Sequence, residues 1–133
     1  MGAWAADPFG NDTACDWGYR ISESDDTSVI VETLQAVTEC DGFIDADIGS
    51  EAVAACEVLA RLKGNWGERT AYTETVDQWV ESHPIAVSSE LAQLASDALT
   101  LVLAPDSELA ELWAEAEDHD WAKSVEELRQ RIL

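Results

Sequence analysis

Apolar residues recur at spacings of three and four along most of this chain, which is the periodicity of an α-helix with one buried face. The clearest example covers about residues 51–63, where Ala, Val and Leu fill most positions. A helix that is apolar nearly all round usually lies at the centre of a domain. Glu57 and Arg61 stand four residues apart on it, so we expect them to pair on its one solvated face.

The same periodicity predicts further helices on both sides of this segment. We expect an all-α single domain over residues 1–133, with about six to seven short helices around a central Ala/Val/Leu-rich helix. Residues 1–10 are predicted to be a loop, and residues 40–50 an acidic connection before the central helix. The other predicted helices cover about 12–21, 27–39 and 73–83, one begins at Ser88 or Ser89, one at Asp106 or Ser107, and the last runs from about 120 to the end.

The segment 27–39 contains conflicting signals. Its start, residues 29–31, is a run of β-branched side chains, which locally favours a strand. Ile30, Leu34 and Val37 follow spacings of four and three, which favour a helix. We predict a helix.

The six tryptophans fall into two groups. Trp79, Trp113 and Trp121 occupy core positions of predicted helices, so we expect them in the core. The other three, Trp4, Trp17 and Trp66, lie near loops or helix ends. Aromatic side chains at such positions are either interface anchors or fillers of the gaps between short helices.

The charge of the chain is unusual for its size. It has 28 Asp and Glu against seven Lys and Arg, a formal net charge of −21, whereas a magnitude of about 2–8 is usual for a small domain. Direct binding to nucleic acid or to an anionic membrane needs clustered Lys and Arg, so neither is expected. Residues 21–60 contain no Lys or Arg. Either a basic partner compensates these acids, or they serve solubility in general.

The sequence contains no recognisable catalytic or metal-binding motif. Cys15, Cys40 and Cys56 form no Cys-x-x-Cys pair and indicate free thiols in a reducing cytoplasm. The acids of residues 41–47 do not have the spacing of a calcium loop. His83 lies on an apolar helix face, which indicates a helix-end histidine. We therefore predict a cytoplasmic, non-enzymatic protein without metal, cofactor or membrane-spanning segment.

The first 17 residues carry a distinctive motif. They read Met-Gly-Ala-Trp-Ala-Ala-Asp-Pro-Phe-Gly-Asn-Asp-Thr-Ala-Cys-Asp-Trp, which resembles the opening of the domain of unknown function 4259 family, a family of small bacterial and archaeal proteins. Segments 51–62 and 106–113 are similar to its middle and C-terminal patterns. The family usually has Gly at the positions of Ala5 and Asp7, so a turn that needs positive φ there would differ in this chain. The resemblance implies no established activity.

This N-terminal segment supplies the candidate binding residues. Asn11, Asp12 and Asp16 suit the start of a helix, where an acceptor caps free amides and negative charge is favourable. Asp12 and Asp16 also share a helix face and repel each other, so a binding role stays open beside the structural one. The predicted binding residues are Trp4, Phe9, Asn11, Asp12, Asp16 and Trp17.

Three functional hypotheses follow. The first is an interaction protein, immunity-like or inhibitor-like, that binds a basic protein by electrostatic steering and complementarity. The second is a housekeeping or stress-related protein whose acidity is a high-salt solubility adaptation. One continuous acidic patch favours the first, and acids spread around every helix favour the second. The third is an enzyme with an unrecognised site, which a titratable residue with a strongly shifted pKa in a cleft would indicate.

Overall fold

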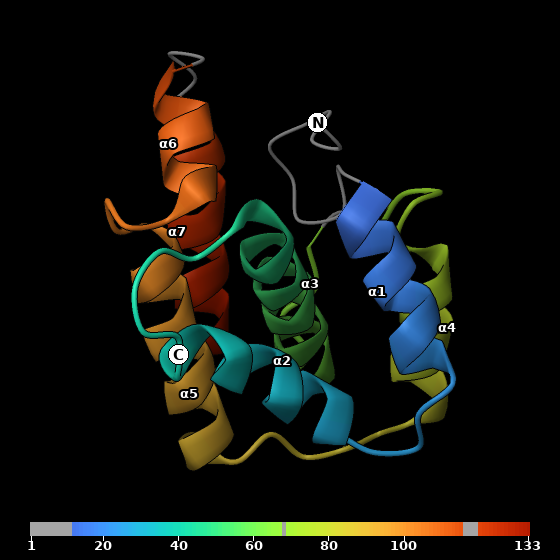
Figure 1. Cartoon of the computed structure of the whole chain (residues 1–133). Helices are drawn as coiled ribbons and strands as arrows, with labels where there is room; N and C mark the ends of the chain where they lie inside the picture. Colours follow the sequence, from blue (N-terminus) through green and yellow to red (C-terminus); the bar gives the residue numbers. More distant parts are fainter. Residues whose placement is uncertain (1–11, 68, 116–119) are drawn as a thin grey trace.

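The computed structural model describes residues 12–67, 69–115 and 120–133 (Figure 1). Within these ranges the chain forms seven helices and no named strand, so the predicted all-α fold is confirmed. The predicted loop over residues 1–10 lies outside the described residues. The helices are α1 (Asp12–Ser22), α2 (Ser28–Thr38), α3 (Ala46–Leu62), α4 (Glu74–Ser82), α5 (Ser89–Val102), α6 (Glu108–Glu115) and α7 (Asp120–Ile132).

The central position predicted for the Ala/Val/Leu-rich helix is confirmed. Figure 1 shows α3 in the middle of the molecule, with α1 and α4 on one side and α5 and α7 on the other. Each of the other six helices packs against it. All residues from Ala52 to Arg61 are buried. Small Ala side chains along α3 let the surrounding helices approach closely on all sides.

The start of α3 differs from the prediction, because the helix begins at Ala46 and not near residue 51. The Asp45 side chain accepts a hydrogen bond from the Ile48 amide at 2.9 Å, which is the geometry of an N-cap. Gly49, which resembled a loop residue in the sequence, lies inside the helix. A Cβ at Gly49 would stand 2.9 Å from Leu109 Cδ1, so glycine allows α6 to pack closely here.

The connection between α2 and α3 is tied to the start of α6. The Ile44 amide donates to the Asp106 carbonyl at 2.9 Å, and the Glu108 amide donates to the Ile44 carbonyl at 2.8 Å. Glu108 also accepts a hydrogen bond from the Ala46 amide through Oε1 at 2.7 Å. These bonds satisfy backbone groups at two helix starts, which have no partner within their own helices.

The aromatic side chains fill the contacts between helices. Trp79 and Trp121 are buried, as predicted, and the partly buried Trp113 stacks on Trp121 with ring centroids 6.3 Å apart. Trp79 Nε1 donates to the Ser24 carbonyl at 2.7 Å. His83 stacks on Trp79, with centroids 4.7 Å apart, and its Nδ1 lies 2.9 Å from the Trp79 carbonyl oxygen. The prediction of a helix-end histidine is therefore confirmed.

Candidate functional site

The largest concentration of buried charge lies in the C-terminal half of α3. The predicted ion pair between Glu57 and Arg61 is present, with Arg61 Nε 2.9 Å from Glu57 Oε2. Its predicted position on a solvated face was wrong, because both side chains are only 2% exposed. Taking two charges out of water costs several kcal/mol per ion unless further partners compensate them.

Those further partners come from α4 and α7. Arg131 donates two hydrogen bonds to Glu57, from Nη2 to Oε1 at 2.6 Å and from Nη1 to Oε2 at 2.9 Å. Arg61 donates from Nη1 to Asp77, and Asp77 also accepts from the Thr73 hydroxyl at 2.8 Å. The hydrogen bonds and charge of Glu57 raise the pKa of Arg131, against the effect of its burial. These contacts tie α3, α4 and α7 together, so this network serves the fold.

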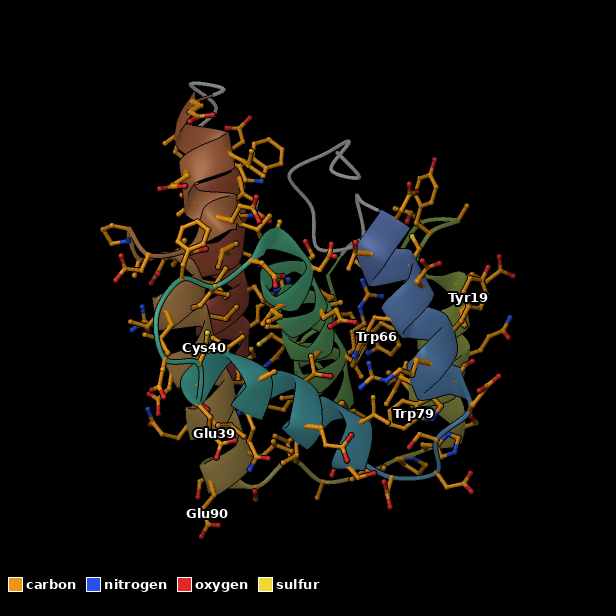
Figure 2. The ribbon with its side chains drawn as sticks, in the orientation of Figure 1. Tyr19, Glu39, Cys40, Trp66, Trp79 and Glu90 are labelled. Carbon is orange, nitrogen blue, oxygen red and sulfur yellow. The ribbon has the colours of Figure 1, made fainter. Side chains whose placement is uncertain are left out.

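The rim of the network is aromatic and more exposed. Arg61 and Arg69 approach the ring of Trp66, with guanidinium carbons 5.3 and 4.3 Å from its centroid. Figure 2 places Trp66 between α3 and α1. Arg69 also pairs with Glu81. The buried ion pairs and this rim together are called the arginine network. Its residues are Glu57, Arg61, Trp66, Arg69, Asp77, Glu81 and Arg131.

The predicted binding residues separate in the structure. Asp12 and Asp16 are exposed on the first turns of α1. Trp17 is only 1% exposed and donates through Nε1 to Thr33 Oγ1 at 2.9 Å, so its side chain belongs to the core. The remaining three, Trp4, Phe9 and Asn11, lie outside the described residues.

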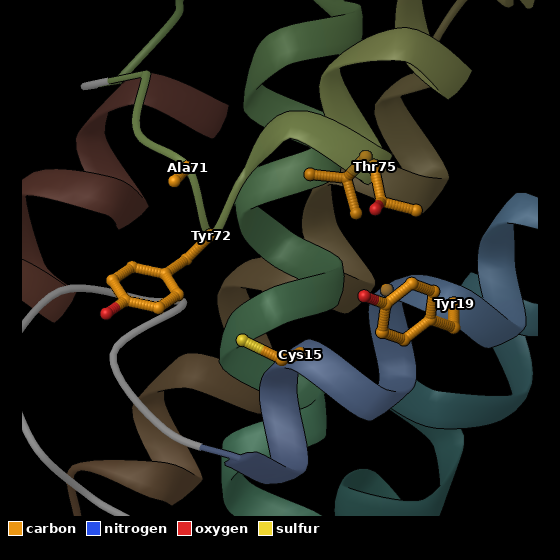
Figure 3. Close-up of a pocket in the computed structure, with 7 residues that line it drawn as sticks. Cys15, Tyr19, Ala71, Tyr72 and Thr75 are labelled. Carbon is orange, nitrogen blue, oxygen red and sulfur yellow. The ribbon is translucent and has the colours of Figure 1, made fainter.

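A hollow of about 230 Å³ lies between α1 and the start of α4. Cys15 and Tyr19 line it from α1, Ala71 and Tyr72 from the segment before α4, and Thr75 and Val76 from α4. Figure 3 shows Cys15 between the two tyrosine rings. The tyrosines are 63% and 56% exposed. We call this pocket the α1–α4 hollow.

Sequence reasoning missed this hollow, although one signal for it exists. The buried stripe of α1 consists of Ala14, Trp17, Gly18 and Ile21, and Tyr19 falls outside it. A large aromatic residue off the apolar stripe of a short helix is a candidate surface anchor. Tyr72, which lines the same hollow, lies 53 positions further along the chain, so only the fold brings the two residues to one pocket.

The acids of the chain are exposed in two patterns. All eight carboxylates between residues 21 and 50 are exposed, and no Lys or Arg lies among them. Figure 1 shows α2 and its two connections, which carry most of them, across the front of the molecule. We call this surface the α2 face; its acids are Glu23, Asp25, Asp26, Glu32, Glu39, Asp41, Asp45 and Asp47.

Exposed acids also occur on every described helix, including those away from the α2 face. Figure 2 labels Glu90 on α5, on the opposite side of the view from α1. One exposed acid on each helix, in chain order, is Asp16, Glu32, Asp47, Glu81, Glu90, Glu111 and Glu127.

Glu51 lies where α1 meets α3, and its ionisation is disfavoured. The pKa of Glu51 is raised mainly by its partial burial, and further by the charges of Asp47 and Asp45, whereas Arg20 lowers it. Arg20 Nη1 lies 3.7 Å from Glu51 Oε2. The arginine therefore does not cancel the combined effect of burial and the two neighbouring acids on Glu51.

The described residues offer little for metal or nucleophile chemistry. Among them, no group of three or more His, Cys, Asp or Glu side chains is arranged to hold a metal ion. Cys56 is fully buried, and its burial raises the pKa of its thiol, which suppresses the reactive thiolate. In the part of the chain that the structure describes, no helix has the length and apolar character needed to cross a membrane.

Comparison with known proteins identifies one family. The sequence model described as domain of unknown function (DUF4259) matches residues 2–124. The match covers the N-terminal motif, the central helix and the first five of the thirteen residues of α7. No curated protein and no solved structure is significantly similar to the chain.

Proposed function

Since the chain belongs to the DUF4259 family, whose description assigns no activity, we propose from its own surface that it is a non-enzymatic protein that binds a basic protein partner. The partner is expected to approach the α2 face. An immunity-like or inhibitor-like role, in which the acidic face covers the nucleic-acid-binding surface of the partner, is one form of this function.

The observation that carries the proposal is the α2 face itself. Eight exposed carboxylates without an intervening Lys or Arg produce a field of one sign over adjacent elements. Such a field raises the rate of encounter with an oppositely charged protein and disfavours acidic competitors. The Debye length is about 8 Å at physiological salt, so neighbouring carboxylates on this face act together.

Six of the seven bases of the chain have partners within the fold, and one of them, Arg20, lies beside Glu51 near the start of α3. Arg61 and Arg131 point into the arginine network, and Arg129 contacts Glu126 and Ser96. Lys63 donates to the Ile132 carbonyl. Because these cations have partners within the fold, they contribute little to the surface that another protein meets.

A second candidate function is supported by the distribution of acids over all described helices. On this hypothesis the acidity is a solubility adaptation to high salt, and the role of the protein is independent of its charge. The two hypotheses differ in whether the position of the acids matters. A partner requires the acids of one face, whereas solvation depends only on their number.

The test compares two triple variants with the same change in net charge. One removes charge from the α2 face with Glu23→Gln, Glu32→Gln and Glu39→Gln. The matched control changes three exposed glutamates on α5 and α6, with Glu90→Gln, Glu111→Gln and Glu115→Gln. Tagged versions of both variants and of the unchanged chain are used to capture proteins from lysate of the source organism, and the captured proteins are eluted with salt.

The proposal predicts one stoichiometric basic protein with the unchanged chain and with the control. Its recovery falls sharply with the α2-face variant, and purified partner binds that variant with a slower association rate. Equal loss with both variants would show that total charge, and not the α2 face, determines binding. An empty eluate from folded protein would refute the proposal and favour the solubility hypothesis.

A further inference from the structure

We propose that the α1–α4 hollow receives a single arginine or lysine side chain of the basic partner. This inference rests on the proposed function, because it identifies which chemical group of such a partner the chain recognises. The hollow is the contact that gives specificity, and the α2 face supplies long-range attraction.

The size of the hollow suits one side chain. Its volume of about 230 Å³ is below the range of about 300–1,000 Å³ that is typical of small-molecule sites. The walls formed by Ala71, Thr75 and Val76 are mostly apolar and match the aliphatic stem of a long basic residue. Such stems bury along apolar surface while the charged end stays near water.

The two tyrosine rings suit the charged end of that side chain. A guanidinium or ammonium group within about 6 Å of an aromatic ring is attracted by the negative face of the ring. Figure 3 shows Tyr19 and Tyr72 on either side of the hollow. The same chain already uses this interaction internally, where Arg61 and Arg69 approach Trp66.

Two carboxylates of α1, Asp12 and Asp16, are expected to favour a cation at the site. Asp12 precedes Cys15 by three residues, and Asp16 precedes Tyr19 by three, which places the four residues on neighbouring positions of the α1 surface. Both carboxylates are exposed. The base on this helix, Arg20, lies beside Glu51 of α3, so it does not neutralise the approach to the hollow.

The experiment titrates the full chain with N-acetyl-arginine amide and follows backbone amides by NMR. N-acetyl-citrulline amide is the neutral control, because it has nearly the same shape without the charge. The proposal predicts saturable shifts around Tyr19 and Tyr72 with the arginine compound and much smaller shifts with the citrulline compound. Equal shifts with both compounds, or shifts only elsewhere on the protein, would overturn it.

Matched variants test the roles of the ring and the carboxylate. Tyr72→Ala is expected to weaken the arginine compound about two- to fivefold, whereas Phe43→Ala, at an aromatic residue that is 52% exposed, leaves the affinity unchanged. Asp16→Asn weakens it about twofold, and Asp97→Asn on α5 does not. Unchanged affinity in Tyr72→Ala contradicts the proposal.

Three further outcomes separate this inference from its alternatives. If Trp4→Ala increases the affinity for the arginine compound more than about tenfold, the first residues of the chain themselves occupy the hollow, and the proposal is wrong. If Tyr72→Ala captures the basic partner as well as the unchanged chain does, the hollow does not receive a side chain of that partner. The inference is then wrong, and the proposed function stands. If no partner is captured while the hollow still binds the arginine compound selectively, the proposed function is wrong, whereas the hollow remains a site for a basic side chain.

Discussion

Replacing Glu57 with glutamine tests whether the arginine network stabilises the fold. Glu57 is 2% exposed and accepts hydrogen bonds from both Arg61 and Arg131. Removing one partner of a buried ion pair costs about 3–5 kcal/mol, because the remaining charges stay buried without compensation. Glutamine keeps the volume and one carbonyl acceptor, so we expect the lower end, about 3 kcal/mol. With an unfolding entropy of about 0.28 kcal/mol/K for a domain of this size, Tm falls by about 11 °C.

The matched control is Glu81→Gln, the same substitution at the exposed edge of the network. Glu81 pairs with Arg69, but the two side chains are 59% and 53% exposed. Exposed ion pairs contribute about 0–1 kcal/mol, which corresponds to at most about 4 °C here. Both variants are compared with the unchanged chain by calorimetry at fixed salt. If the two Tm values agree within about 4 °C, burial does not govern the strength of this network and the reasoning fails.

Three further predictions concern close packing, pH and thiol reactivity. Gly49→Ala places a methyl group against Leu109 of α6, so we expect the free energy of unfolding, measured with urea, to fall by about 1–3 kcal/mol. An unchanged free energy would show that α6 shifts to accommodate the methyl group without loss of stability, and would contradict this prediction. The pKa of Glu51 is raised in the folded protein, so its ionised form opposes folding. Glu51 therefore adds to the free energy of unfolding below its unfolded pKa, and this contribution is lost as pH rises through its folded pKa. Glu51→Gln is therefore expected to raise Tm at neutral pH, with the gain vanishing in acid, and a Tm below that of the unchanged chain at neutral pH would refute this. Cys56 is fully buried with a raised thiol pKa, so a thiol reagent should modify it last, at the rate of unfolding; mass spectrometry that finds it modified first would contradict the packing of α3.

The helices were predictable because each carries its own local signal. The apolar composition of residues 51–63 placed α3 at the centre, and the spacing of Ile30, Leu34 and Val37 outweighed the β-branched start of α2. The start of α3 was not predictable from its own residues. Gly49 resembles a loop residue until Leu109, 60 positions away, is known to pack against it.

The arginine network was only half predictable for the same reason. The spacing of Glu57 and Arg61 on one helix predicts that they pair, but such pairs are usually solvated. Their burial depends on Asp77 and Arg131, which the fold brings from two other helices. The α1–α4 hollow likewise depends on Tyr72, far from Tyr19 in sequence. Local periodicity therefore predicts the helices. The arginine network and the α1–α4 hollow depend on contacts between segments that are distant in sequence.

All five arginines of the chain form ion pairs with acids of its own fold. Three of the five arginines, Arg61, Arg69 and Arg131, belong to the arginine network, where their partners are acids of the same fold. Holding these cations in place requires only Glu57, Asp77 and a few exposed carboxylates at the rim. The eight acids of the α2 face lie in a segment without any base, and like charges on neighbouring positions oppose folding by small amounts. On the proposed function, the cation that compensates this face belongs to another molecule.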